Sequence, residues 1–324
     1  MALRGFVDLQ VNGFRDVSFT DPELTEEATV VALRGLIADG TAIYLPTVTT
    51  NQESTYAHVL PLLARICKRT EFAQHIPGLH LEGPFLCKSD GAAGAHNPAW
   101  MSAGDTAYLD RLQRLAAGMI RLITIAPDIA GAEGLIRHAR KLGIVVSLGH
   151  HLGTAGNMDR AAVAGATCLT HLGNGLPHLI NRHLNPLIEG MADDRYIAMI
   201  IGDGHHVPWS LVKTILAAKG LERCALVSDA SCLAGMPPGT YQRFGATAVI
   251  DPNGRLYTPA TGYLWGSSYT IRKVVNATQA ALKLDDQTMH RLAVVNPLKL
   301  IGLPVPTDLQ PLARAADGAY VPIS

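Results

Sequence analysis

The sequence lacks long apolar runs and basic clusters, and each absence argues against a class of function. No uninterrupted apolar stretch approaches the ~20 residues that a membrane-spanning helix requires. Lys and Arg together number 27, as do Asp and Glu, so the formal net charge is zero and nothing indicates a nucleic-acid or anionic-membrane surface. The first ten residues, MALRGFVDLQ, lack the apolar segment of a secretory signal. We therefore expect a small-molecule substrate, with no nucleic acid and no membrane as partner.

Cysteine is scarce and shows no pairing pattern. The five cysteines are odd in number, are scattered along the chain and form no CxxC motif. They stand at positions 67, 87, 168, 224 and 232. This distribution favours reduced thiols over a disulfide framework, so we expect a cytoplasmic protein.

What the sequence does contain is a strand–helix alternation that repeats eight times. Segments rich in β-branched and aliphatic residues occupy 5–13, 41–50, 76–85, 119–128, 144–151, 166–175, 196–206 and 224–231. Strands of this kind alternating with helices predict a parallel sheet covered on both faces. Eight units in 324 residues fit a (β/α)8 TIM barrel, which needs ~250 residues. The alternative is a doubly wound open sheet, but its GxGxxG signature is absent after the first strand.

The sequence divides into three predicted parts. Residues 1–239 form the predicted barrel, and 240–262 read as an inserted β-hairpin that turns at 251–254. Residues 263–324 are assigned to the C-terminal helices of the barrel and a short tail.

Polar side chains stand at the ends of six of the predicted strands. In strand order they are Gln10 and Asn12, Glu82, His150 with its neighbour His151, His171, His205 with His206, and Asp229. Active sites of TIM barrels lie at the C-terminal ends of the strands, so these side chains should converge on one rim. One carboxylate and two imidazoles with an open fourth position are the ligand set of a catalytic zinc. Asp229 is then a candidate base for a metal-activated water.

Each of these residues also has a simpler explanation. Glu82 could cap a helix or form an ion pair, and His151 rather than His150 could be the ligand. His171 stands between leucines, where a core histidine is the default, and Asp229 could serve only in an Asx-turn. Their occurrence at successive strand ends is what favours a single site.

The motifs taken together resemble the N-acetylglucosamine-6-phosphate deacetylases of the amidohydrolase superfamily. The segments GFVDLQVNG, GLHLEGPF, GAHNP, SLGH, GATCLTHLGNGLP, GDGHH, LVSDA, WGSS and NPLKLIGL occur in the family's order between about residues 5 and 302. The resemblance implies metal-dependent hydrolysis of an N-acetyl amide, converting N-acetylglucosamine-6-phosphate to glucosamine-6-phosphate and acetate. It also implies a homodimer with one divalent metal ion per subunit, for which zinc is the expected identity.

The resemblance also implies a role for individual residues. The metal ligands would be Glu82, His150 and His171, with Asp229 as general base and then acid and His206 in contact with the substrate. Many amidohydrolases carry His-x-His at the end of the first strand, where this chain has Gln10 and Asn12, so a mononuclear site is expected. Besides these two amides, the implied substrate-binding residues are Ala95, His96, Asn174, Gly175 and, reaching across the dimer, Arg182.

Several departures from the family pattern leave other functions open. We expect most of the family's small β-sandwich domain to be missing, and the segment around Arg182 reads LINRHLNPLIEG rather than the usual Arg-Glu-Pro-Gly. The sequence NGL replaces Asn-Ala-Met, and GHHLGT replaces Gly-His-Ser. One alternative is an amidohydrolase of the same mechanism acting on another N-acylated amine or a cyclic amide. A second is a non-catalytic binding relative, which would not need the four ligand and base residues together.

Overall fold

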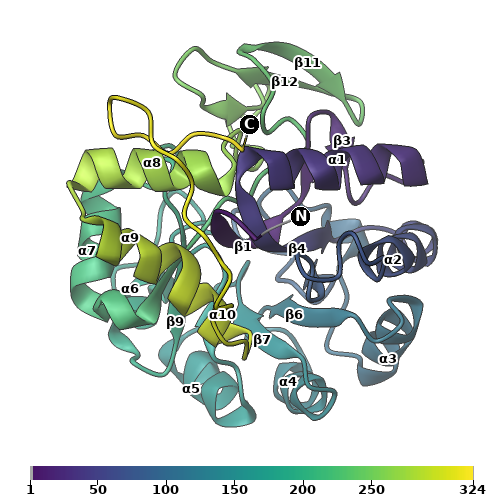
Figure 1. Ribbon diagram of the computed structural model, residues 1–324. Coiled ribbons are helices and arrows are strands. Elements are labelled where there is room, and N and C mark those ends of the chain that lie inside the picture. The colour runs from purple at the N-terminus through teal and green to yellow at the C-terminus, as the bar shows by residue number, and fades with distance from the viewer. Residues whose placement is uncertain (1–2, 324) are drawn as a thin grey trace.

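The chain folds into a nearly closed barrel of eight parallel strands, and the computed structural model describes residues 3–323 (Figure 1). The strands pair in the order β1-β4-β5-β6-β7-β8-β9-β10. They are β1 (Phe6–Val11), β4 (Thr41–Thr49), β5 (Leu79–Glu82), β6 (Ile120–Ile125), β7 (Val145–Leu148), β8 (Cys168–Leu169), β9 (Ile197–Ile201) and β10 (Cys224–Val227). Just beyond β10, the N–H of Asn12 donates to the carbonyl of Ala230 at 2.7 Å and joins the two ends of the sheet. The predicted TIM barrel and its eight strands are confirmed.

Helices follow most strands and surround the barrel, as Figure 1 shows. They are α1 (Glu26–Asp39), α2 (Glu53–Cys67), α3 (Thr106–Leu115), α4 (Ala132–Lys141), α5 (Ala155–Ala164), α6 (Pro186–Ala192), α7 (Trp209–Lys219), α8 (Ile271–Leu282), α9 (Asp286–His290) and α10 (Asn296–Leu300). Short helical turns occur at Pro98–Trp100, Leu221–Arg223 and Arg291–Val295. Local sequence sets the ends: α5 begins at a capping box made by Thr154 and Asn157 and stops at Gly165, whose φ is 112°. No helix within residues 3–323 combines the length and apolar character needed to cross a membrane.

A three-stranded antiparallel sheet stands beside the barrel and contains the predicted hairpin together with one further strand. It contains β11 (Gly239–Arg243), β12 (Ala246–Ile250) and β13 (Leu256–Tyr257), and Figure 1 shows it above α1 and α8. The β11–β12 hairpin turns at Phe244 and Gly245, with φ of 50° and 74°, and this additional turn was not predicted. The predicted turn at 251–254 joins β12 to β13. There the Asp251 carboxylate accepts the N–H groups of Asn253 and Arg255. A second small hairpin, β2 (Gly13–Phe14) with β3 (Val17–Ser18), follows β1.

The hydrophobic core lies between the strands and the surrounding helices, whereas part of the barrel interior is polar. Leu9 and Leu81 from strands and Leu33 and Leu63 from helices are fully buried in this core. Beneath the rim, a chain of hydrogen bonds links five fully buried side chains from neighbouring strands: Thr47, His80, Thr124, Thr170 and Ser147. Aliphatic residues normally fill this layer of a TIM barrel, so the polar layer marks the end at which the site is built.

The segment after α10 returns across the start of β1. Gln310 donates its N–H to the carbonyl of Leu3 and accepts the N–H of Gly5, both at 3.0 Å. The N–H of Ile323 donates to the carbonyl of Ala38 at 2.8 Å, which ties the end of the described chain to α1. These contacts fix the strand that carries Gln10 and Asn12.

Candidate metal centre and active site

Three side chains from successive parts of the barrel rim point their donor atoms at one another. Glu82 is the last residue of β5, and His150 and His171 each follow two residues after a strand, β7 and β8. Their donor atoms all lie within 4.8 Å of one another, and all three residues are buried. His151 lies outside this cluster and accepts the N–H of Gly153 at Nδ1. The alternative ligand His151 is thus not the residue that the fold brings together with Glu82.

The spacing of the three donors fits a small tetrahedral metal ion. The Nε2 atoms of His150 and His171 are 3.1 Å apart, and they lie 3.3 and 2.9 Å from Oε1 of Glu82. Zinc bonds of ~2.0–2.1 Å in tetrahedral geometry separate ligand atoms by ~3.3–3.4 Å, close to these values. Nδ1 of His150 donates to the carbonyl of Ala92 at 2.8 Å, which leaves the Nε2 lone pair free for a metal. The chemistry and spacing of the donor set therefore fit one divalent ion.

The electrostatics keep the carboxylate ionised. Burial opposes the charge on Glu82, but hydrogen bonds with His150 and His171 and the nearby imidazoles hold its pKa well below the usual value. For His171, burial lowers the pKa, but the contact with Glu82 outweighs it and raises the pKa overall. A buried anion between two imidazoles is a strong attractor for a cation.

The candidate site concentrates backbone strain. Among residues 3–323, eight non-glycine residues have positive φ, and three of them are His150 (52°), His171 (29°) and Asp229 (50°). Each such conformation costs on the order of 1–2 kcal/mol. The carbonyl of each accepts a backbone N–H: His150 from Cys87 at 3.1 Å, His171 from Asn174 on the same turn at 2.9 Å, and Asp229 from Ser267 at 2.8 Å. Strain of this kind clusters where function demands a fixed side-chain direction.

The two amides at the end of β1 face the two carboxylates. Nε2 of Gln10 donates to Oε1 of Glu82 at 2.9 Å, and Nδ2 of Asn12 donates to Oδ1 of Asp229 at 2.7 Å. A carboxylate only accepts hydrogen bonds, so each amide must turn its NH2 group inward and its oxygen away. A second cation between these residues would meet N–H hydrogens instead of lone pairs. This geometry favours a single metal over a pair.

Asp229 lies two residues beyond β10, and the groups around it shift the pKa of its carboxyl. Burial and the nearby charge of Glu82 raise its pKa, while His171, His206 and the hydrogen bond from Asn12 act in the opposite direction. A raised pKa suits a group that must take up a proton and release it again at neutral pH. The simple Asx-turn explanation also fails to account for the contact with Asn12, 217 residues away in sequence.

His206 is held by a carboxylate that the sequence motifs did not single out. Oδ2 of Asp203 lies 2.7 Å from Nδ1 of His206 and also accepts the hydroxyl of Ser267 at 3.0 Å. His205 points elsewhere: its Nε2 lies 3.1 Å from the carbonyl of Asn253. The Asp-Gly-x-His spacing was the available signal, because it places the carboxyl and the imidazole on one turn.

The residues expected to bind substrate fall into two groups. Nε2 of His96 lies 3.3 Å from Nε2 of His150, and burial together with His150 lowers the pKa of His96 to about 3. Asn174 donates both its N–H and its side-chain Nδ2 to the carbonyl of His171, and Gly175 lies directly against the ring of His150. Ala95, next to His96, is exposed. Arg182 is not brought into the cluster: it lies exposed on its loop, where Nε donates to Nε2 of His183 at 3.0 Å.

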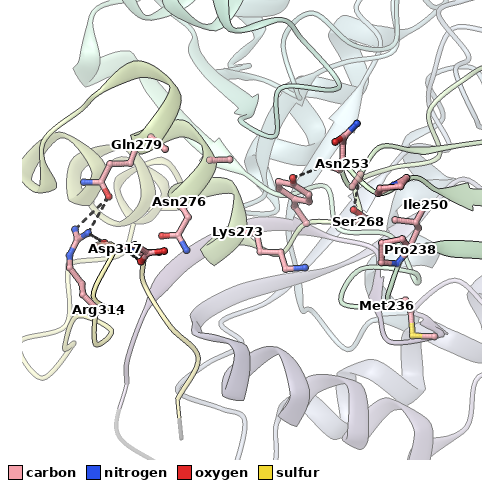
Figure 2. A pocket seen from close by; sticks show the side chains of 17 residues that line it. Met236, Pro238, Ile250, Asn253, Ser268, Lys273, Asn276, Gln279, Arg314 and Asp317 are labelled. Atoms are coloured by element: carbon pink, nitrogen blue, oxygen red, sulfur yellow. Dashed lines mark hydrogen bonds between the residues drawn. The ribbon is translucent and has the colours of Figure 1, made fainter.

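One cavity of the molecule lies away from the metal centre. It encloses about 730 Å³ outside the barrel, between α8, the C-terminal segment and the three-stranded sheet, and Figure 2 shows Lys273, Asn276 and Arg314 among its lining residues. None of the metal donors lines it, so this cavity and the cluster of Glu82 with the two histidines are separate features of the molecule. A small cavity of about 20 Å³, room for about one water, lies against His150 and Asn174.

Comparison with known proteins gives consistent relatives across nearly the whole chain, although no protein-family model matches. An N-acetylgalactosamine-6-phosphate deacetylase of Escherichia coli O157:H7 is 30% identical over 316 residues, which cover 96% of this chain and 81% of the relative. An N-acetylglucosamine-6-phosphate deacetylase of Bacillus subtilis is 29% identical, covering 82% of this chain and 66% of the relative. A Mycobacterium smegmatis N-acetyl-D-glucosamine-6-phosphate deacetylase, solved as a mutant in complex with N-acetyl-D-glucosamine-6-phosphate, superposes with a TM-score of 0.84 at 29% identity, covering 94% of this chain and 78% of that chain. With this fold, this site and these relatives, the chain belongs to the N-acetylglucosamine-6-phosphate deacetylase family of the amidohydrolase superfamily.

Proposed function

We propose that the protein hydrolyses the acetamide of N-acetylglucosamine-6-phosphate, releasing glucosamine-6-phosphate and acetate. The observation that carries the proposal is the convergence of Glu82, His150 and His171 beside Asp229 in a barrel of this family. Those three residues would hold one divalent ion, for which zinc is the expected identity. When bound, the ion supplies Lewis acidity that makes a water acidic enough to ionise near neutral pH.

Asp229 moves the protons in this proposal. Its carboxylate accepts a proton from the attacking water and later delivers it to the departing amine, which its raised pKa allows. Asn12 holds the carboxylate at Oδ1, so Oδ2 stays available for the proton. His206 contacts the substrate and stabilises the oxygen that gains negative charge in the transition state.

The substrate-side roles follow the residues' positions around His150 and His171. His96 reaches the metal donors from the loop before α3, and Asn174 and Gly175 border them from the loop after β8. Gln10 turns an unpaired, buried amide oxygen away from Glu82, where it can accept a substrate hydroxyl or water. Ala95 lies on the same loop as His96 and extends this wall.

We also place the protein in the cytoplasm as a homodimer. All five cysteines are free thiols, as expected in a reducing compartment. The loop that carries Arg182 exposes Leu179, of which 91% is accessible, and Leu184, and the adjoining α6 exposes Ile188. An apolar loop of this kind suits burial against a second copy. In this proposal the exposed Arg182 on that loop reaches the site of the partner subunit.

A substrate panel tests the proposal. The wild-type protein should turn over N-acetylglucosamine-6-phosphate well above N-acetylglucosamine, and N-acetylgalactosamine-6-phosphate belongs in the panel because of the Escherichia coli relative. Arg182→Ala should lose about ten- to a hundredfold in kcat/KM on phosphorylated substrates only, since it removes a charge-assisted contact. Arg137→Ala, an exposed arginine of α4 paired with Glu133, is the matched control and should change nothing.

The opposite results would change the proposed substrate or the proposed activity. Preference for the unphosphorylated sugar, or equal loss on both forms in Arg182→Ala, would leave only hydrolysis of another N-acylated amine. No turnover of any amide by the metal-loaded protein would favour a non-catalytic binding relative. If Arg182 acts across the dimer, mixing Arg182→Ala with Asp229→Asn should restore part of the activity in heterodimers.

A further inference from the structure

Four hydrogen-bond donors converge on one buried carboxylate beside the candidate site. Asp203 follows β9 and is 5% exposed. Its Oδ1 accepts the backbone N–H groups of His205 and His206 at 2.8 and 2.9 Å. Its Oδ2 accepts Nδ1–H of His206 at 2.7 Å and the hydroxyl of Ser267 at 3.0 Å. Every contact of this carboxylate is therefore with a donor.

We propose that Asp203 is a positioning residue that keeps the proton of His206 on Nδ1 and presents Nε2 to the substrate. The role in turnover rests on the proposed function, in which His206 contacts the substrate. The tautomer itself follows from the geometry alone, because a carboxylate 2.7 Å from Nδ1 requires a proton between the two atoms.

The charge state of the pair supports this assignment. Burial opposes ionisation of Asp203, but His206 and the N–H groups of His205 and His206 lower its pKa to about 2. The carboxylate is thus ionised at neutral pH. It can balance a second proton on His206, so that Nε2 becomes a charged donor toward an oxygen that gains negative charge.

The same carboxylate connects two neighbouring strand ends. Ser267, which donates its hydroxyl to Asp203, also donates its backbone N–H to the carbonyl of Asp229 at 2.8 Å. Asp203 therefore fixes His206 relative to the turn that carries the proposed base. A shift of either strand end would move both groups together.

The geometry predicts what the isosteric substitution does. In Asp203→Asn, the two backbone N–H groups cannot become acceptors, so the amide oxygen must stay with them. The amide NH2 then faces Nδ1 of His206, which has to give up its proton and accept. The ring proton moves to Nε2, the ring can no longer take a second proton, and His206 becomes a neutral donor of fixed tautomer.

Long-range ¹H–¹⁵N NMR on substrate-free protein with ¹⁵N-labelled histidine reads this tautomer directly. His206 is assigned by its absence in His206→Gln. We expect a protonated Nδ1 in the wild type and a proton only on Nε2 in Asp203→Asn. Ser267→Ala, which removes one donor but leaves the carboxylate, is the matched control and should keep the wild-type tautomer. Metal content should be unchanged in both variants.

Kinetics provides the second readout. Asp203→Asn should lower kcat by about ten- to a hundredfold with a much smaller change in KM, because the lost charge acts chiefly in the transition state. A wild-type His206 without a proton on Nδ1 would overturn the proposal even if the variant failed to fold. The proposal would also be overturned if Asp203→Asn kept the proton on Nδ1 of His206, or if Ser267→Ala lost as much kcat as Asp203→Asn. A tautomer that moves as expected in a protein inactive on amides would instead refute the proposed function alone.

Discussion

A methyl group at residue 175 should disturb the metal centre through His150. Residue 175 is a glycine with a φ of +62°. A Cβ added at Gly175 would lie 2.9 Å from Nδ1 and 3.1 Å from Cγ of His150, about 0.5 Å inside the 3.4 Å at which ordinary contact begins. The same Nδ1 donates to the carbonyl of Ala92 at 2.8 Å, so the ring cannot yield without straining that hydrogen bond.

The expected magnitude has two parts. Placing alanine in the left-handed region costs roughly 1–2 kcal/mol, and weakening the bond to Ala92 costs about 0.5–1.5 kcal/mol. Gly175→Ala should therefore lower the free energy of unfolding of the metal-free protein by about 1.5–3.5 kcal/mol. Losing the group that orients a metal-binding histidine typically weakens metal affinity by ~10–100-fold.

Urea denaturation of metal-free protein and competition with a chelator measure the two quantities. Gly143→Ala is the matched control, because Gly143 has a φ of +78° and no other group lies within 4 Å of the position that a Cβ would take there. It should lose only the backbone part, with metal affinity unchanged. Equal stability losses and equal metal affinities in the two variants would refute the argument that Gly175 makes room for His150.

Three further results follow from the site. Elemental analysis should find close to one tight divalent ion per chain, lost in His150→Ala or His171→Ala, whereas two tight equivalents would contradict the single-metal geometry. Asp229→Asn should lower kcat by ~10²–10⁴-fold with the metal retained, and loss of the metal would make this residue a ligand instead. Burial raises the pKa of Asp8 from 3.8 to about 7, so between these values the folded state holds a proton that the unfolded state has released. Stability should then fall as pH rises through this window by on the order of 4 kcal/mol relative to Asp8→Asn, and parallel stability–pH curves of the two proteins would exclude the effect.

The barrel was predictable because its physical signal is local and repeated. Strands buried on both faces are apolar runs, and a barrel of this size needs eight of them. The convergence of Glu82, His150 and His171 followed from the same rule, since strand ends share one rim. The turn at 251–254 was predictable because Asp251-Pro252-Asn253-Gly254 is a strong turn signal, whereas the β11–β12 turn was missed because Phe244-Gly245 is a weak one.

Other features depend on contacts that span most of the chain and leave no local mark. Adjacent histidines 150 and 151 are equivalent in sequence, and only the positive φ of His150 decides which one faces Glu82. Gln10 finds its carboxylate 72 residues away, and Asp203 finds Ser267 64 residues away. A sequence pattern can name such residues, but only the fold shows which partner each one has.

The strained turns connect the proposed metal donors and base to the surrounding loops. His150, His171 and Asp229 each adopt the left-handed conformation, and together these turns cost on the order of 3–6 kcal/mol. The hydrogen bonds that hold them come from Cys87, in the loop that leads to His96, from Asn174 and from Ser267. The loops that carry Cys87 and Asn174 also form the proposed substrate side of the site. A change that reshapes a loop for a new acyl group or sugar therefore also loosens a turn that aims a metal donor. The altered loop sequences of this chain must keep these three backbone contacts, whatever substrate they select.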